Sequence, residues 1–156
     1  MTKKFNQLSL LLFTGTLFLL GFFSTAKASE FRPPVKREGR IVQATCHMGS
    51  CSWFKLLSVS VAENQKGETV VTQNLLGGSS KHQGGYPNTA KGVKINWSTK
   101  YTSVATCSKK QPRLTEFNET RRLNLRNFPR VEESAVVTYL YACHTYDGLD
   151  TALFGY

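Results

Sequence analysis

Four cysteines constrain the fold of this chain more than any other feature of its sequence: Cys46, Cys51, Cys107 and Cys143. An even number of cysteines is typical of structural disulfides in an exported protein, whereas cysteines in a reducing compartment more often bind metal or act in catalysis. The compartment therefore decides what these four residues do, and the N-terminal sequence indicates which compartment it is.

The first 28 residues have the three-part order of a secretory signal peptide. Two lysines stand near the start, residues 8–23 are apolar or small, and a motif of A-x-A type ends at Ala28. The apolar run is shorter than the roughly 20 residues that a membrane-spanning helix needs. We therefore expect cleavage before Ser29 and a periplasmic or secreted protein with no membrane span afterwards. An uncleaved N-terminal anchor is the alternative.

Four cysteines allow three pairings, and the spacing favours Cys46–Cys51 together with Cys107–Cys143. The first bridge closes a small ring, in which Gly49 supplies the flexibility that a tight turn needs. The second bridge joins two segments that we expect to be strands. Chain-entropy estimates give about 2 kcal/mol for the small ring and about 4 kcal/mol for the large one. The large ring should therefore stabilise the fold, and the small ring should shape a surface loop.

Zinc binding is the alternative use of these cysteines. Two Cys-His dipeptides occur, Cys46-His47 and Cys143-His144, and the spacing from Cys46 to Cys51 resembles that of structural zinc sites. Adjacent Cys and His side chains rarely reach one ion together, and an oxidising compartment favours disulfides. We therefore expect no bound metal and no other cofactor.

Runs of β-prone residues predict several short strands after residue 40, over residues 41–46, 52–62, 69–76, 93–107, 121–125 and 134–145. A turn signal at 63–67 predicts a hairpin from Trp53 to Leu76, in which Trp53 and Leu57 share one face of the first strand. Residues 134–145 are apolar on both faces, which predicts a central strand.

No segment shows convincing helical periodicity, so we predict a mainly β fold. It should be a single antiparallel domain over residues 41–156, either a sandwich or a barrel, stabilised by its disulfides. The polar, Pro-containing segment 29–40 should form a flexible leader between the signal peptide and this domain.

Two surface features are candidates for binding a partner. The small ring carries His47, Met48, Gly49 and Ser50. A Gly-rich loop at 77–92 holds five glycines, and loops of this length are usually functional or disordered. Its candidate contact residues are Lys81, His82 and Tyr86.

Charge is distributed unevenly along the chain. Residues 81–130 contain 11 Lys and Arg against two glutamates, whereas residues 131–156 contain four acids and no Lys or Arg. A basic stretch suits an anionic partner such as an envelope polymer, and a solvated basic surface is the simpler alternative. Nucleic acid does not fit the expected compartment, so we do not expect it as a partner.

The ring Cys46-His47-Met48-Gly49-Ser50-Cys51 resembles the inhibitory loop of periplasmic inhibitors of vertebrate lysozymes. In that family a histidine of the ring enters the lysozyme cleft, although here the histidine directly follows the first cysteine. This resemblance implies a role as an inhibitor, or as an immunity-type protein, against a cell-wall hydrolase.

No catalytic motif stands out in the chain. A small hydrolase could use His144 with Asp147 or Asp150, but neither a G-x-S-x-G nor an H-E-x-x-H motif supports it. The sequence therefore favours a non-enzymatic binding protein that presents the small ring and the Gly-rich loop to a protein or an envelope polymer. The inhibitor and the hydrolase are the alternatives.

Overall fold

The computed structural model describes residues 30–156, so the expected signal peptide at 1–28 lies outside the described residues. This part of the chain contains strands β1 (Ile41–His47), β2 (Ser50–Glu63), β3 (Thr69–Lys81), β4 (Asn96–Cys107), β5 (Arg113–Glu116) and β6 (Glu119–Arg122), the helix α1 (Glu133–His144) and the 3-10 helices η1 (Arg130–Glu132) and η2 (Thr151–Phe154). Within residues 30–156, no helix has the length and apolar character needed to cross a membrane.

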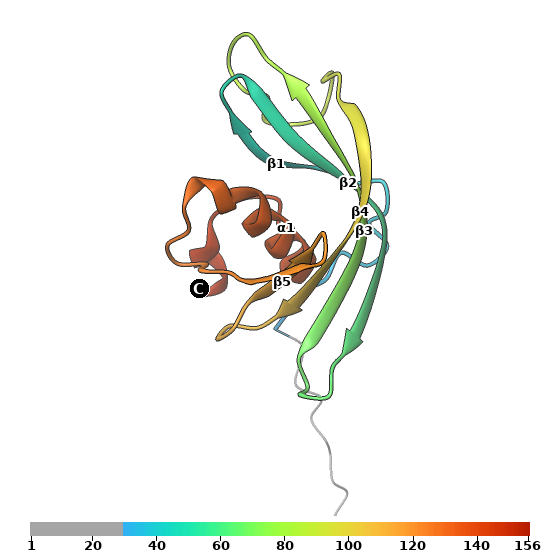
Figure 1. The fold of residues 1–156 in the computed structure, drawn as a ribbon, viewed down its shortest axis with the longest axis vertical. Helices are drawn as coiled ribbons and strands as arrows, with labels where there is room; N and C mark the ends of the chain where they lie inside the picture. The colour runs from blue at the N-terminus through green and yellow to red at the C-terminus, as the bar shows by residue number, and fades with distance from the viewer. Residues whose placement is uncertain (1–29) are drawn as a thin grey trace, which may run out of the picture.

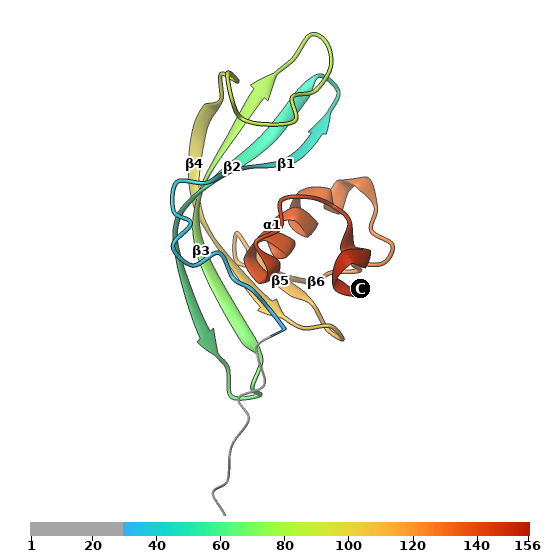
Figure 2. The ribbon, with the colours of Figure 1, turned by 180° about the vertical axis from the view of Figure 1, so that it is seen from behind.

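The six strands form one antiparallel sheet in sequence order, and this sheet curls into a half-barrel around α1 (Figures 1 and 2). Val71 of β3, Ala105 of β4 and Leu114 of β5 are fully buried in one core cluster with Leu140 of α1. The prediction of a mainly β, antiparallel, disulfide-stabilised fold is confirmed. The helix occupies the concave side, where a sandwich would place a second sheet.

The prediction of a central strand at 134–145 is wrong, because this segment forms α1. Every residue from Ala135 to Cys143 is buried. A helix that is enclosed on all sides lacks the polar stripe that produces a 3.6-residue period, so its sequence resembles that of a buried strand. The helix ends where Thr145 adopts a left-handed conformation and its amide bonds to the carbonyls of Leu140 and Tyr141.

The hairpin predicted at 53–76 is present, but β3 continues as far as Lys81. The loop expected at 77–92 therefore begins at residue 82, because its first glycines belong to the strand. A Cβ atom on Gly78 would lie 2.7 Å from Cε3 of Trp97 on β4. This glycine is thus required by close packing between two strands and not by a turn.

A bulge in β2 changes which of its residues face the core. The pairing with β3 shifts between Leu56 and Ser58, so Leu56 is fully buried while Leu57 is 36% exposed. Val59, beyond the bulge, packs on the same core cluster as Phe54 and Leu56, so the single alternation expected along this strand does not continue past Leu56. One extra residue in a strand reverses the alternation beyond it.

Both expected disulfides are present, Cys46–Cys51 and Cys107–Cys143. The second joins β4 to α1 and not one strand to another, and its two Cα atoms lie 5.6 Å apart. All four sulfur atoms are used in these bridges. No cysteine thiolate is therefore left to bind zinc, which was the alternative use of these residues.

The described part of the expected leader, residues 30–40, follows the surface of the domain. The amide of Arg32 donates to the carbonyl of Cys143 at 2.7 Å, and the hydroxyl of Thr145 donates to the carbonyl of Arg32 at 2.6 Å. Further along, the amide of Gly39 donates to the carbonyl of Leu56 at 2.8 Å. These bonds place the segment against α1 and β2, and its flexibility stays a prediction.

Candidate functional site

The small ring is the tip of the β1–β2 hairpin. Cys46 and Cys51 are directly paired across the two strands, with their Cα atoms 4.0 Å apart. Met48 and Gly49 form the turn, with φ angles of 49° and 73°, the positive values of a type I′ turn. Glycine adopts such angles readily, whereas methionine does so at a cost. Since 86% of Met48 is exposed, the ring presents an apolar side chain at the end of the sheet.

The Gly-rich loop is attached directly to this tip. The amide of Gly49 donates to the hydroxyl of Tyr86, 37 residues further along the chain, at 3.0 Å. The carbonyl of Gly49 accepts from the amide of His82 at 2.8 Å. A Cβ atom at position 49 would lie only 3.2 Å from the carbonyl oxygen of His82. Glycine therefore allows the ring and the loop to approach closely.

A buried serine anchors the start of the loop to the sheet. The indole Nε1–H of Trp53 donates to the hydroxyl oxygen of Ser80 at 2.7 Å, and the same oxygen lies 2.7 Å from Nε2 of His82. Trp53 and Ser80 are 3% and 2% exposed. The imidazole of His82 is thereby held against the end of β3. The sequence analysis missed Ser80 because its role depends on the true length of that strand.

The remaining candidates lie at the same end of the sheet. Ser50 and Lys81 are opposite partners in the β2–β3 pairing, and the hydroxyl of Ser50 donates to the carbonyl of Ser80 at 3.2 Å. The side chains of His47 and Lys81 are exposed. The structure thus brings all seven predicted binding residues to the upper end of the molecule in Figure 1, here called the tip surface: His47, Met48, Gly49, Ser50, Lys81, His82 and Tyr86.

A cavity of about 620 Å³ separates the tip surface from the start of α1. His47 and Tyr86 line one side, and Val131 and Glu133 line the other. The hydroxyl of Thr45 donates to Oε2 of Glu133 at 2.9 Å, which ties β1 to the helix. Val131 is 87% exposed. Sequence reasoning missed Val131 and Glu133 because only the docking of α1 brings them to the ring.

The residues of the alternative catalytic group, His144, Asp147 and Asp150, lie at and beyond the other end of α1. Nε2 of His144 lies 3.0 Å from the hydroxyl of Tyr156, and the carboxylate of Asp147 pairs with Arg40 at 3.2 Å. Asp150 precedes η2 without a side-chain capping bond. Burial, together with the Lys109 ammonium, lowers the pKa of His144 to about 4, so this imidazole is a weak base.

Across residues 30–156, no group of three or more His, Cys, Asp and Glu side chains is placed to hold a metal ion. Comparison with models of known protein families, with curated sequences and with solved structures found no significant match to this chain. Its function therefore has to be inferred from the geometry of its own residues.

Proposed function

We propose that this chain is an exported, non-enzymatic binding protein that holds a protein partner on its tip surface. The hydrogen bond from Gly49 to Tyr86 carries this proposal. It joins two exposed segments, the small ring and the loop that follows β3, into one surface.

A disulfide and several hydrogen bonds within the chain order the tip surface. The disulfide fixes the ring, and the bonds among Trp53, Ser80 and His82 fix the start of the loop. A surface that is already ordered loses less conformational entropy on binding, which increases affinity. The ordered tip surface is therefore suited to binding a partner without a large change of its own conformation.

The exposed residues around the cavity favour a protein as the partner. Met48 and Val131 are 86% and 87% exposed, and Tyr86 is 44% exposed. Methionine and tyrosine are enriched at protein interfaces, where methionine adapts to irregular contacts. The cavity beside them has the volume to accept a side chain of the partner. An inhibitor of a cell-wall hydrolase is a narrower form of this function, in which the ring enters the cleft of the enzyme.

The partner can be trapped by a photoreactive amino acid placed at position 48 in cells that export the protein. We expect one cross-linked protein species from this position. The matched control is the same amino acid at Leu153, a residue of η2 that is 64% exposed and lies outside the tip surface. Equal cross-linking from both positions, or none from position 48, contradicts the proposal. A cell-wall hydrolase as the trapped species identifies the inhibitor.

Substitution of Met48 by asparagine then tests the surface with the trapped partner. Asparagine tolerates the positive φ of this turn, so the hairpin should keep or gain stability while the apolar side chain is lost. We expect affinity to fall about tenfold or more, as for a buried interface residue, and the melting temperature not to fall. Leu153→Asn should leave the affinity unchanged. An unchanged affinity of the Met48→Asn variant rules out the ring as the contact.

Tyr86→Phe tests the link between the ring and the loop. It removes the hydroxyl that accepts from Gly49 and leaves the aromatic ring in place. One neutral hydrogen bond contributes about 0.5–1.5 kcal/mol. We therefore expect the affinity for the trapped partner to fall about two- to tenfold. Surface plasmon resonance with both variants measures this difference.

A further inference from the structure

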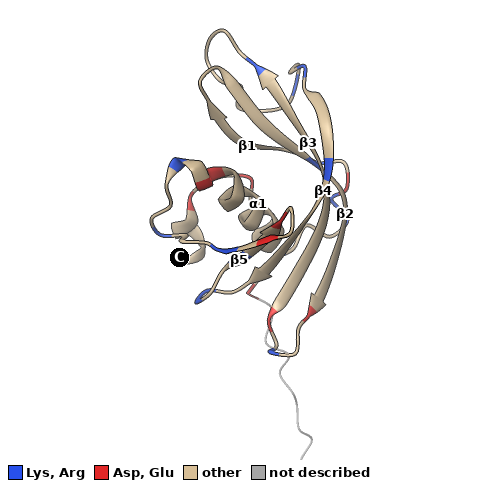
Figure 3. Ribbon diagram, viewed as in Figure 1, with Lys and Arg blue, Asp and Glu red and all other residues tan. Residues whose placement is uncertain are grey.

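A second cavity, also of about 620 Å³, lies away from the tip surface, beside the β4–β5 turn and the C-terminal residues. Its walls carry four cations: Lys109, Lys110, Arg122 and Arg126. Leu123 and Leu125, each 3% exposed, contribute buried apolar side chains to the same cavity. The lining of the cavity therefore combines basic and apolar residues. Figure 3 shows how the basic positions are distributed over the fold.

Most of the positive charge in this cavity is not neutralised by neighbouring acids. Lys109 pairs with Glu30 at 3.1 Å and lies 4.5 Å from the ring centre of Tyr156. Arg122 donates to the carbonyl of Lys110 at 3.1 Å, a contact that orients the guanidinium without cancelling its charge. Among the described residues, the side chains of Lys110 and Arg126 have no hydrogen-bond or ion-pair partner.

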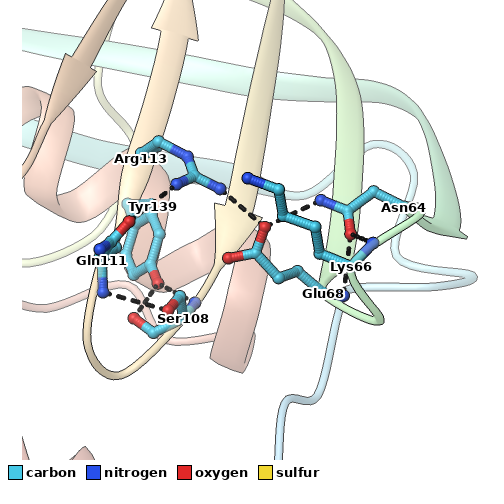
Figure 4. Close-up of polar contacts among 7 residues, drawn as sticks. All are labelled: Asn64, Lys66, Glu68, Ser108, Gln111, Arg113 and Tyr139. Carbon is cyan, nitrogen blue, oxygen red and sulfur yellow. Dashed lines mark hydrogen bonds and ion pairs between the residues drawn. The ribbon is translucent and has the colours of Figure 1, made fainter.

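The turn that carries the two lysines is held in place by the bonds drawn in Figure 4. The amide of Ser108 donates to the hydroxyl of Tyr139 at 3.0 Å, and the amide of Gln111 donates to the hydroxyl of Ser108 at 3.1 Å. Arg113 closes the turn by donating to Glu68 at 2.7 Å and to Gln111 at 3.3 Å. The lysines therefore extend from a fixed backbone.

The second wall is connected to the first through the backbone. The amide of Leu123 donates to the carbonyl of Pro112 at 2.9 Å. Asn124 accepts the amides of Arg126 and Asn127 on its side-chain oxygen, at 3.3 Å and 3.2 Å. Both walls are thus ordered before a ligand binds, which lowers the entropic cost of binding.

We infer that this cavity binds a ligand that carries phosphate ester groups on a sugar or polyol. Two arginines and two lysines match the charge and the oxygen atoms of more than one phosphate, since guanidinium groups bind phosphate through two parallel hydrogen bonds. The leucines in the lining suit contact with the carbon skeleton of such a ligand. Phosphate-bearing polymers of a cell envelope and small phosphorylated sugars share this chemistry. This site is independent of the tip surface and its protein partner.

Calorimetric titration of the purified, disulfide-bonded protein tests this inference. A salt concentration of about 50 mM leaves charge interactions only partly screened. The probes are fructose 1,6-bisphosphate, sodium phosphate and unphosphorylated fructose. We expect the bisphosphate to bind and fructose not to bind. If the bisphosphate binds more tightly than sodium phosphate, the cavity recognises more than one phosphate group held on one carrier; if the two bind equally, the cavity is a site for free phosphate and the inference fails. If neither phosphate probe binds at about 10 mM, any dissociation constant exceeds that concentration and is too weak for a specific site. That result refutes the inference.

The double variant Lys110→Gln with Arg126→Gln removes two cations that have no structural partner. Hydrogen bonds to charged groups contribute about 1.5–3 kcal/mol, so we expect binding of the bisphosphate to weaken about 10- to 100-fold. The matched control is Lys94→Gln with Lys100→Gln, two exposed lysines that do not line the cavity. Equal weakening by both double variants would show a nonspecific effect of net charge and overturn the inference. Met48→Asn should leave phosphate binding unchanged, so failure at the tip surface and failure here are distinguishable.

Discussion

At the scale of single residues, His144 is enclosed by aromatic side chains at the end of α1. Its ring stacks on Phe154 with the ring centres 4.1 Å apart, and Phe31 lies 5.5 Å from it. Burial and the neighbouring Lys109 lower the pKa of His144 to about 4, against an opposing effect of Glu30. The imidazole is therefore neutral near pH 7, and its contact with Tyr156 ties the C-terminal residues to the helix.

The depressed pKa of His144 predicts that the protein loses stability on mild acidification. The unfolded chain binds a proton at this histidine near pH 6.5, whereas the folded protein does so only near pH 4. The free energy of unfolding should therefore fall as the pH drops from about 6.5 to about 4, by about 1–2 kcal/mol because the site is partly screened by solvent. Urea unfolding at several pH values measures the slope. His144→Gln should flatten it, and an unchanged slope would show that other groups cause it.

Single residues also show how far the tip surface could be predicted. The ring residues and Tyr86 were found because cysteine spacing and a long Gly-rich stretch are local signals. Ser80 was missed because its contact with Trp53 depends on the pairing of β2 with β3. Val131 was missed because it reaches the cavity only through the position of α1. Local patterns therefore revealed which segments are exposed, but not which of them lie together.

At the scale of elements, the strands that alternate were predicted and the element that does not alternate was misassigned. The segments that form β1 to β4 carry turn signals and half-buried patterns, and their boundaries are off by a few residues. Residues 134–145 contain β-branched and aromatic residues and are apolar throughout. Such a composition arises in a buried strand and in a fully enclosed helix alike, so only the tertiary structure distinguishes them.

The two disulfides connect different elements and should differ in their effect on stability. Cys107–Cys143 joins β4 to α1 within the core, where the two residues are 2% and 0% exposed. Cys46–Cys51 only closes a hairpin. Replacing the first pair by alanine should lower the free energy of unfolding by about 4 kcal/mol, and replacing the second pair by about 2 kcal/mol. Chemical denaturation of the two double variants measures this difference. A larger loss for the hairpin pair contradicts the assignment of the core bridge as the main stabiliser.

At the scale of the whole molecule, the curled sheet encloses a row of polar side chains beside α1. Gln73, Ser103 and Glu116 are successive partners across β3, β4 and β5, and they are 0%, 0% and 9% exposed. Among the described residues, the side-chain amide of Gln73 and the hydroxyls of Ser103 and Tyr141 have no hydrogen-bond partner. Buried polar groups of this kind reduce stability. The half-barrel therefore owes its stability to the apolar contacts on either side of this row and to the bridge into α1.

Glu116 allows the cost of this polar row to be measured. Burial raises the pKa of its carboxyl group, although Arg121 acts in the opposite direction. A folded-state pKa above the unfolded value means that Glu116 lowers stability at neutral pH and that this loss disappears as the pH falls through the folded-state pKa. Glu116→Gln should therefore raise the free energy of unfolding at pH 7 by about 1 kcal/mol. The stability gained by Glu116→Gln should vanish in acid. Acid thus removes the cost of Glu116, whereas it lowers stability through His144.

The control is Glu119→Gln, at the exposed partner position on β6, which should change stability by less than about 0.5 kcal/mol. If urea unfolding shows Glu116→Gln to be destabilising at pH 7, the carboxylate has a stabilising partner and the row is a structural network.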